Sequence, residues 1–266
     1  GRERPAQAGA GVHRRREANE QSAEIFNLRK ITDSKAAAAI TLEHAGLFLR
    51  EAAKVLDTGL NGLFEQNLQK LNTAREGQRT LQHWANIIAA NTFKVFRLMQ
   101  WAEVEITQLY STTLSSLQEM SESMRDIVVR AHLHVANNHS GLLDEQIAEL
   151  DQVRGGVLAI LEQAATALRR GDCPNCDEIA SANRDFRLLV NQFDQNQIAR
   201  IQSNRSKTRL SILFYGLMWD SLKIAEHATQ LLTVFQEPSM LEALRANAGA
   251  SEPRVPAAEL APNPTA

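Results

Sequence analysis

Two acidic residues four positions apart, Glu122 and Asp126, are the first candidates for chemistry in this 266-residue chain. On a helix, this spacing places both carboxylates on one face. Carboxylate oxygens are the ligands that hard cations prefer, so a second acidic face meeting the first could hold a metal ion. The sequence Glu-His-Ala occurs twice, and its second occurrence contributes Glu226 to that second face. The alternative is that these are solvated helix charges, with Arg125 and Lys223 as partners.

Cys173 and Cys176 are the only cysteines, and they stand in the sequence CPNC. A structural zinc site needs four ligands, and no second pair with suitable spacing accompanies this one. A redox motif would normally occur beside a strand–helix–strand pattern, which the sequence lacks. We therefore interpret the pair as part of a loop, without a disulfide framework, and we expect a reducing compartment.

A basic segment, RIQSNRSKTRL, joins the last two predicted helices. Its positively charged residues are Arg200, Arg205, Lys207 and Arg209. They lie beside the N-terminus of the last predicted helix, where free backbone N–H groups and the helix dipole favour anions. The segment therefore predicts contact with an anion, an anionic lipid headgroup or an acidic partner surface, and a solvated turn is the alternative.

The sequence lacks the patterns on which several enzyme classes depend. No Glu-x-x-His pair occurs, which counts against a di-iron carboxylate enzyme. There is no glycine-rich phosphate loop, and no serine, histidine and aspartate arrangement with supporting context. The formal net charge of −2 gives no overall attraction to nucleic acid. We predict a protein that is not an enzyme, has no nucleic-acid partner, and has a divalent or ferric metal as its one candidate cofactor.

The elements that must position these residues are long helices. Only Pro174 interrupts residues 31–236, and long stretches without proline that are rich in Ala, Leu, Gln and Glu favour helix. Apolar residues repeat with helical spacing in six segments, which are 34–56, 60–98, 103–135, 144–170, 177–201 and 208–235. The last segment begins almost wholly apolar, as a central helix would. Its apolar stripe continues through its charged half, so Asp220 and Lys223 need not enter the core.

The helical region has polar flanks on both sides. We predict a disordered or juxtamembrane linker over 1–30, a helical domain over 31–237, and a disordered tail rich in proline and alanine over 238–266. No stretch reaches the ~18 uncharged apolar residues that a membrane span needs. Because the chain begins with Gly1 rather than Met, we expect it to be part of a longer protein. Within the fourth segment, the pair at 155–156 is glycine, which we interpret as a place of close helix approach.

Three stretches of the sequence resemble the PhoU-like cytosolic domains attached to inorganic phosphate transporters of the PiT type. HVANNHSGLLDEQIAEL at 134–150 is similar to the junction of their third and fourth helices. SKTRLSILFYGLMWDSLKIAEHATQLL at 206–232 is similar to their last helix, and TLEHAG at 41–46 to their first. The resemblance implies an all-α fold in which six long helices form two pseudo-repeated three-helix bundles.

The resemblance also implies a role in phosphate uptake. The chain would act on the cytoplasmic side of the inner membrane as a regulatory domain of a bacterial phosphate transporter, in contact with that transporter's transmembrane part. A stand-alone PhoU-like adaptor that regulates phosphate uptake and signalling is the alternative, and the possibility of a homodimer stays open.

Stand-alone PhoU proteins carry a metal-binding motif, Glu/Asp-x-x-x-Asp, in each repeat. Glu122 and Asp126 match this motif in the first repeat. In the second repeat, Leu222 stands at the position of the first acid and Glu226 at the second. The resemblance therefore implies Glu122, Asp126 and Glu226 as metal ligands, while Leu222 counts against a second metal cluster.

Overall fold

The computed structural model describes residues 34–96 and 104–236, and these ranges are helical apart from short turns. The elements are α2 (Ser34–Phe64), α3 (Leu68–Phe96), α4 (Val104–Ala136), α5 (Asp144–Arg170), α6 (Cys176–Gln202), α7 (Thr208–Leu231) and the 3₁₀ helix η1 (Leu232–Gln236). No strand occurs in these ranges, so the predicted all-α class is confirmed. The predicted linker over 1–30 and tail over 238–266 lie outside the described residues.

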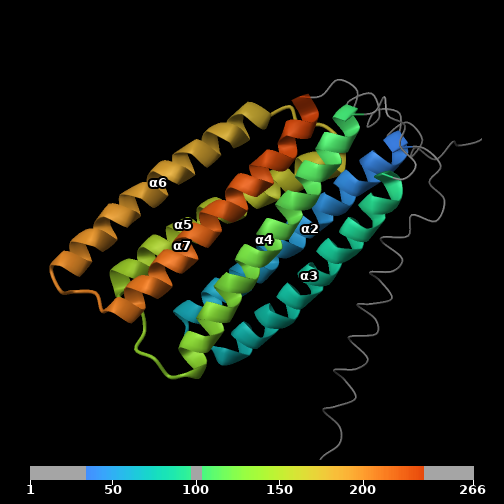
Figure 1. Cartoon of the computed structure of the whole chain (residues 1–266). Helices are drawn as coiled ribbons and strands as arrows, with labels where there is room; N and C mark the ends of the chain where they lie inside the picture. The colour runs from blue at the N-terminus through green and yellow to red at the C-terminus, as the bar shows by residue number, and fades with distance from the viewer. Residues whose placement is uncertain (1–33, 97–103, 237–266) are drawn as a thin grey trace, which may run out of the picture.

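The helices form two three-helix bundles that lie side by side (Figure 1). The first bundle contains α2, α3 and α4, and the second contains α5, α6 and α7. The bundles meet where α2 packs against α5 and where α4 packs against α7. These four helices form the centre of the molecule, and α3 and α6 lie on its flanks. The predicted pair of bundles is confirmed, and α7 is the central helix that its apolar first half predicted.

A single apolar core runs through both bundles. Its largest side chains include Phe48 and Leu56 of α2, Met120 of α4 and Phe214 of α7, and each is almost fully buried. Because apolar burial is the dominant favourable contribution to folding, this shared core holds the two bundles together. In the described part of the chain, no helix has both the length and the apolarity required to cross a membrane.

The break between the first two helices is not where the sequence predicted it. The prediction placed the break at residues 57–59, but α2 continues to Phe64. Leu63 is buried in the core, and this burial maintains the last turns of α2. The chain turns at Gln66, which has a left-handed φ of 53°. Asn67 then caps α3, because its side-chain oxygen accepts hydrogen bonds from two backbone N–H groups of the first turn.

Each of the four described turns between helices contains one residue with a left-handed φ. These residues are Gln66, Asn138, Gly171 and Asn204. A left-handed residue just after a helix lets the next N–H groups bond back to the last carbonyls, which ends the helix sharply. Such short turns reverse the chain direction and keep consecutive helices antiparallel. The basic segment predicted from the sequence occupies the last of these turns, between α6 and α7.

The two glycines inside α5 have different environments. A Cβ atom on Gly156 would lie 2.6 Å from Cδ2 of Phe186, so α6 approaches α5 closely at this point. A Cβ atom on Gly155 would meet nothing within 4 Å. The predicted close helix approach is therefore confirmed for Gly156 and wrong for Gly155.

Candidate functional site

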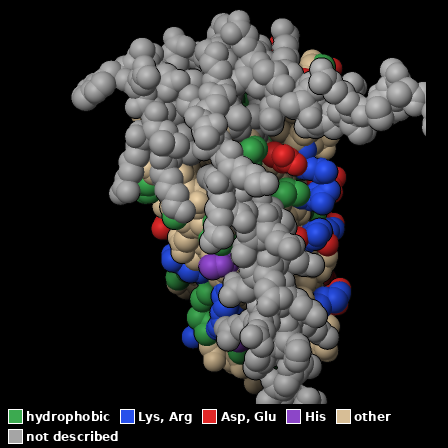
Figure 2. Space-filling model, turned by 90° about the vertical axis from the view of Figure 1, so that its right-hand side faces the viewer, with side chains coloured by type: hydrophobic (Ala, Val, Ile, Leu, Met, Phe, Trp, Pro, Cys, Tyr) green, Lys and Arg blue, Asp and Glu red, His purple; other side chains and the backbone are tan. Residues whose placement is uncertain are grey.

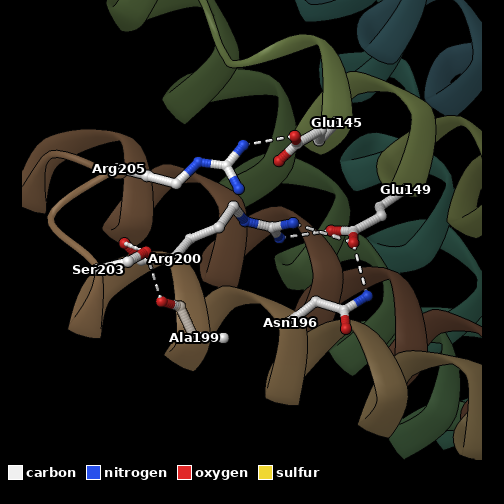
Figure 3. Close-up of a pocket in the computed structure, with 7 residues that line it drawn as sticks. All are labelled: Glu145, Glu149, Asn196, Ala199, Arg200, Ser203 and Arg205. Atoms are coloured by element: carbon white, nitrogen blue, oxygen red, sulfur yellow. Dashed lines mark hydrogen bonds and ion pairs between the residues drawn. The ribbon is translucent and has the colours of Figure 1, made fainter.

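An open pocket of about 360 Å³ lies between the start of α5 and the end of α6 (Figure 3). Its lining consists of Glu145, Glu149, Asn196, Ala199, Arg200, Ser203 and Arg205. Two members of the predicted basic segment, Arg200 and Arg205, line it, and each points toward a glutamate of α5 (Figure 3). The pocket therefore presents charges of both signs, already paired.

Arg200 is buried and bound inside the fold. Its guanidinium forms a bidentate ion pair with Glu149. The two hydrogen bonds measure 3.0 Å from Nη1 to Oε1 and 2.5 Å from Nη2 to Oε2. Its Nε donates to Gln197, and the guanidinium lies 5.3 Å from the ring centre of Phe214. Bidentate pairs of this kind are the stronger ones in proteins. To contact an external anion, as the sequence predicted, Arg200 would first have to leave Glu149.

The other three basic residues of the segment are exposed. Arg205 pairs with Glu145 at 2.5 Å, and both side chains are more than half exposed, so the pair holds them only weakly. Lys207 is the residue directly before α7, and Arg209, in the first turn of α7, donates to Nδ1 of His139. We call Arg205, Lys207 and Arg209 the basic turn. They place three cations at the N-terminal end of α7.

A layer of buried glutamines and their serine partners supports the basic turn. Gln146 of α5 donates to Gln197 of α6 at 3.0 Å, and both glutamines are fully buried. Gln197 in turn donates to the hydroxyls of Ser206 and Ser211, which tie the turn and α7 to α6. Sequence reasoning missed this layer. One signal was available, because Gln197 follows Phe193, a residue of the apolar stripe, by one helical turn.

Two histidines lie near Arg209 of the basic turn: His134 in the last turn of α4, and His139 in the turn that follows α4. His134 is buried, and its Nε2 donates to the carbonyl oxygen of Ser140 at 3.0 Å. Burial lowers the pKa of His134 below its ordinary value. The hydrogen bond to Ser140 opposes this shift, while the nearby His139 and Arg209 add to it. A neutral His134 therefore avoids adding a further charge behind the cations of the turn.

The three predicted metal ligands do not converge. Glu122 is exposed on α4, whereas Asp126 is half-buried and pairs with Arg125 at 3.2 Å and Arg130 at 3.6 Å. Glu226 of α7 pairs with Arg187 of α6. Across the described residues, no group of three or more His, Cys, Asp and Glu side chains is placed to hold a metal ion. Asp126 and Glu226 pair with arginine side chains, and this arrangement does not fit a resident metal cluster.

Asp220 differs from its predicted environment. The sequence suggested that it need not enter the core, yet it is only 5% exposed. Arg130, from α4, forms an ion pair with Oδ2 of Asp220, and Lys223 lies 3.3 Å from Oδ1. The buried charge is thus neutralised by a residue of the other bundle, which the stripe of α7 alone could not reveal.

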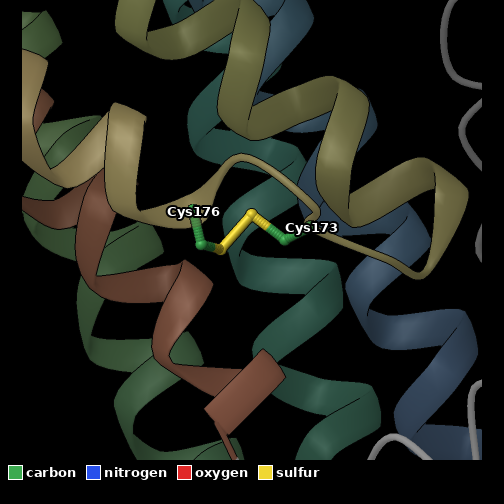
Figure 4. Close-up of a disulfide and its surroundings, with 2 residues drawn as sticks. All are labelled: Cys173 and Cys176. Carbon is green, nitrogen blue, oxygen red and sulfur yellow. A yellow bond between two sulfur atoms is a disulfide. The ribbon is translucent and has the colours of Figure 1, made fainter.

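The two cysteines form a disulfide in the turn between α5 and α6 (Figure 4). The cysteines lie in a loop, as predicted, but the interpretation without a disulfide did not anticipate this bond, which forms because the turn through Pro174 and Asn175 brings their Cα atoms to 5.3 Å. The two residues are three positions apart, so the bond closes a small loop and braces only this turn. In this form neither sulfur is free to bind a metal.

The surface carries charges of both signs close together. On the face seen in Figure 2, basic and acidic side chains lie beside one another where described residues are visible. This mixture agrees with the formal net charge of −2.

Comparison with known proteins identifies the fold. No family model and no curated protein matches the sequence. Among solved structures, the crystal structure of PhoU from Pseudomonas aeruginosa is similar, with a TM-score of 0.63 over 82% of this chain and 100% of that chain. The fold is PhoU-like. Sequence identity in this comparison is 12%, so the likeness concerns the fold alone. It confirms the PhoU-like fold implied by the three resembling stretches and does not address attachment to a transporter.

Proposed function

We propose that this chain is a regulatory domain that acts in phosphate uptake and catalyses no reaction itself. The observation that carries the proposal is the PhoU-like arrangement of both bundles, which covers the whole PhoU chain of Pseudomonas aeruginosa. The geometry of the pocket supports the absence of catalysis, because Glu149 and Arg200 neutralise each other there. A general base or acid would need a side chain that is free to exchange a proton with a substrate instead.

The more specific proposal is that the domain docks on the cytoplasmic face of an inorganic phosphate transporter, whose transmembrane part lies outside this chain. Support comes from the resemblance of residues 134–150 and 206–232 to transporter-attached PhoU-like domains. The second candidate is a stand-alone adaptor, and the likeness to the PhoU chain is equally consistent with it. The gene sequence upstream of the codon for Gly1 separates the two, since several encoded membrane spans there would support the attached domain.

The basic turn supplies the contact in this proposal. Its three cations are exposed, and they lie at a helix N-terminus that adds partial positive charge. An acidic cytoplasmic loop of a transporter would complement this surface. A domain that binds one transporter conformation more tightly than another shifts the transporter toward that conformation, which is the physical route to regulation.

The test reverses the charges of the basic turn with Arg205→Glu, Lys207→Glu and Arg209→Glu in one variant. We expect docking on the transporter's membrane part to weaken at least about tenfold, since three attractive pairs become repulsive. Phosphate uptake by cells should change in parallel. Folding should be preserved, because acidic residues at the start of α7 suit the helix dipole.

Arg79→Glu is the matched control, because Arg79 is an exposed arginine of α3, far along the chain from the turn. It should leave docking and uptake unchanged. If the triple variant docks and regulates like the unmodified chain, the basic turn is not the contact. Binding of the unmodified chain to vesicles of anionic lipid, but not to the transporter, would identify the membrane surface as the partner.

A further inference from the structure

Arg130 lies between acidic side chains of the two bundles. It extends from α4 of the first bundle and forms an ion pair with Asp220 of α7 in the second. Its Nη2 also lies 3.6 Å from Oδ2 of Asp126, one helical turn earlier on α4. A single guanidinium therefore contacts one carboxylate from each bundle.

The backbone of α7 is shaped to receive this guanidinium. A Cβ atom on Gly216 would lie 2.5 Å from Nη1, 3.0 Å from Cζ and 3.1 Å from Cδ of Arg130. Any residue with a side chain at 216 would push the guanidinium away from α7. Gly216 precedes Asp220 by one helical turn, so the space left by the glycine leads directly to the carboxylate.

The buried carboxylate requires a positive charge nearby. Asp220 has a side chain that is only 7% exposed, and an ionised carboxylate buried without a partner is strongly unfavourable. Lys223 contributes a second contact at 3.3 Å, but its side chain is 57% exposed and comes from the same helix. Arg130 is therefore the partner that both neutralises Asp220 and connects the bundles.

We infer that the Arg130 guanidinium joins the two bundles through Asp220 and, beside Asp126, supplies the positive charge that the acidic motif predicted a metal ion would supply. A metal bound between carboxylates and a guanidinium between carboxylates satisfy the same electrostatic need. Here Asp126 and Asp220 face the arginine. The junction of α4 and α7 is then independent of metal.

The first test compares Arg130→Gln with Arg125→Gln by thermal unfolding, with EDTA and with excess Mn²⁺. Arg125 also pairs with Asp126, but it has no contact of this kind with α7, so it is a matched control. For the unmodified chain, we expect the same Tm with Mn²⁺ and with EDTA. Arg130→Gln should lower Tm by about 5 °C or more, while Arg125→Gln should change it by about 1 °C or less.

The second test is a double-mutant cycle with Asp220→Asn. Removing both charges leaves no unpaired buried ion, so the loss in Tm for the double variant should be smaller than the sum of the two single losses. If Arg130→Gln does not fold, the double variant should fold better than it does. Arg130→Lys, which keeps the positive charge, should lose less than Arg130→Gln.

Two results would overturn the inference. One is additive losses in the cycle, which would mean that Arg130 and Asp220 do not stabilise each other. The other is Mn²⁺ binding by the unmodified chain that raises Tm by several degrees and disappears in Asp126→Asn. That result would show that a metal ion, rather than the arginine, neutralises these carboxylates.

Discussion

At the scale of single residues, the main feature of the pocket is the buried ion pair of Glu149 and Arg200, which both line it. Arg200 is 6% exposed and Glu149 is 9% exposed. The Glu149 carboxylate accepts a further hydrogen bond from Asn196, whose side-chain amide donates to Oε1 at 2.8 Å. A buried pair is tolerated when its hydrogen bonds are satisfied in this way, and loss of one partner leaves the other charge without compensation.

Glu149→Gln should therefore destabilise the chain by about 3 kcal/mol, since it leaves the Arg200 guanidinium buried with a neutral neighbour. The measurement is the free energy of unfolding in urea. Glu145→Gln is the matched control, because Glu145 makes the exposed pair with Arg205 in the same pocket. It should cost roughly 0.5 kcal/mol or less.

Equal losses for Glu149→Gln and Glu145→Gln would contradict this account of the pocket. The variant Glu149→Gln/Arg200→Met provides a further check. It removes both buried charges, so it should recover part of the stability that Glu149→Gln loses.

The candidate residues could be found in the sequence, and so could a partner on the same helix, Arg125 beside Asp126, but their partners on other helices could not. Residue chemistry and spacing point to Arg200, Glu226 and Asp126. Their contacts depend on which helices are neighbours and how those helices are rotated. Glu149 and Arg200 are 51 residues apart, and periodicity within one helix contains no information about such a pair.

At the scale of helices, the glycine pair in α5 allows a direct comparison of helix propensity with packing. Gly155→Ala should stabilise the chain by up to about 1 kcal/mol, because alanine favours helix and the position is open. Gly156→Ala should instead destabilise it by roughly 1–3 kcal/mol, since the new methyl group would overlap the ring of Phe186. Urea unfolding of the two single variants measures both effects.

The neighbouring positions make each variant the control for the other. A stabilising Gly156→Ala would mean that α6 can move away from α5 without loss. In that case the close approach of the two helices would not depend on the glycine.

Helix boundaries were predictable where local signals mark them. The predicted segment 144–170 matches α5, because Gly171 and Pro174 stop a helix whatever surrounds it. The end of α2 was missed for the opposite reason. Local composition favoured a break at 57–59, but burial of Leu63 in the shared core outweighs that preference.

At the scale of the whole molecule, the important feature is that the two bundles share one core. The core includes Leu56 of the first bundle and Phe214 of the second, and both are fully buried. The sequence predicted the six α-helices found in residues 34–96 and 104–236, and the resemblance implied their grouping. The junction of the bundles required the structure, because it depends on pairs such as Arg130 with Asp220.

A shared core predicts that both bundles unfold in one transition. Trp84 on α3 reports the first bundle and Trp219 on α7 reports the second. A chain with Trp101→Phe and Trp219→Phe keeps only Trp84, and a chain with Trp84→Phe and Trp101→Phe keeps only Trp219. In each of these chains, fluorescence and far-ultraviolet circular dichroism should give the same urea midpoint.

Leu56→Ala makes the test sharper, because it creates a cavity in the first bundle while the signal comes from the second. Truncating a fully buried leucine should cost about 3 kcal/mol. If the core is shared, this loss lowers the midpoint reported by Trp219 as much as the midpoint reported by Trp84. A midpoint at Trp219 that stays unchanged would mean that the second bundle unfolds independently. The contacts of α2 with α5 and of α4 with α7 would then join two separate folding units.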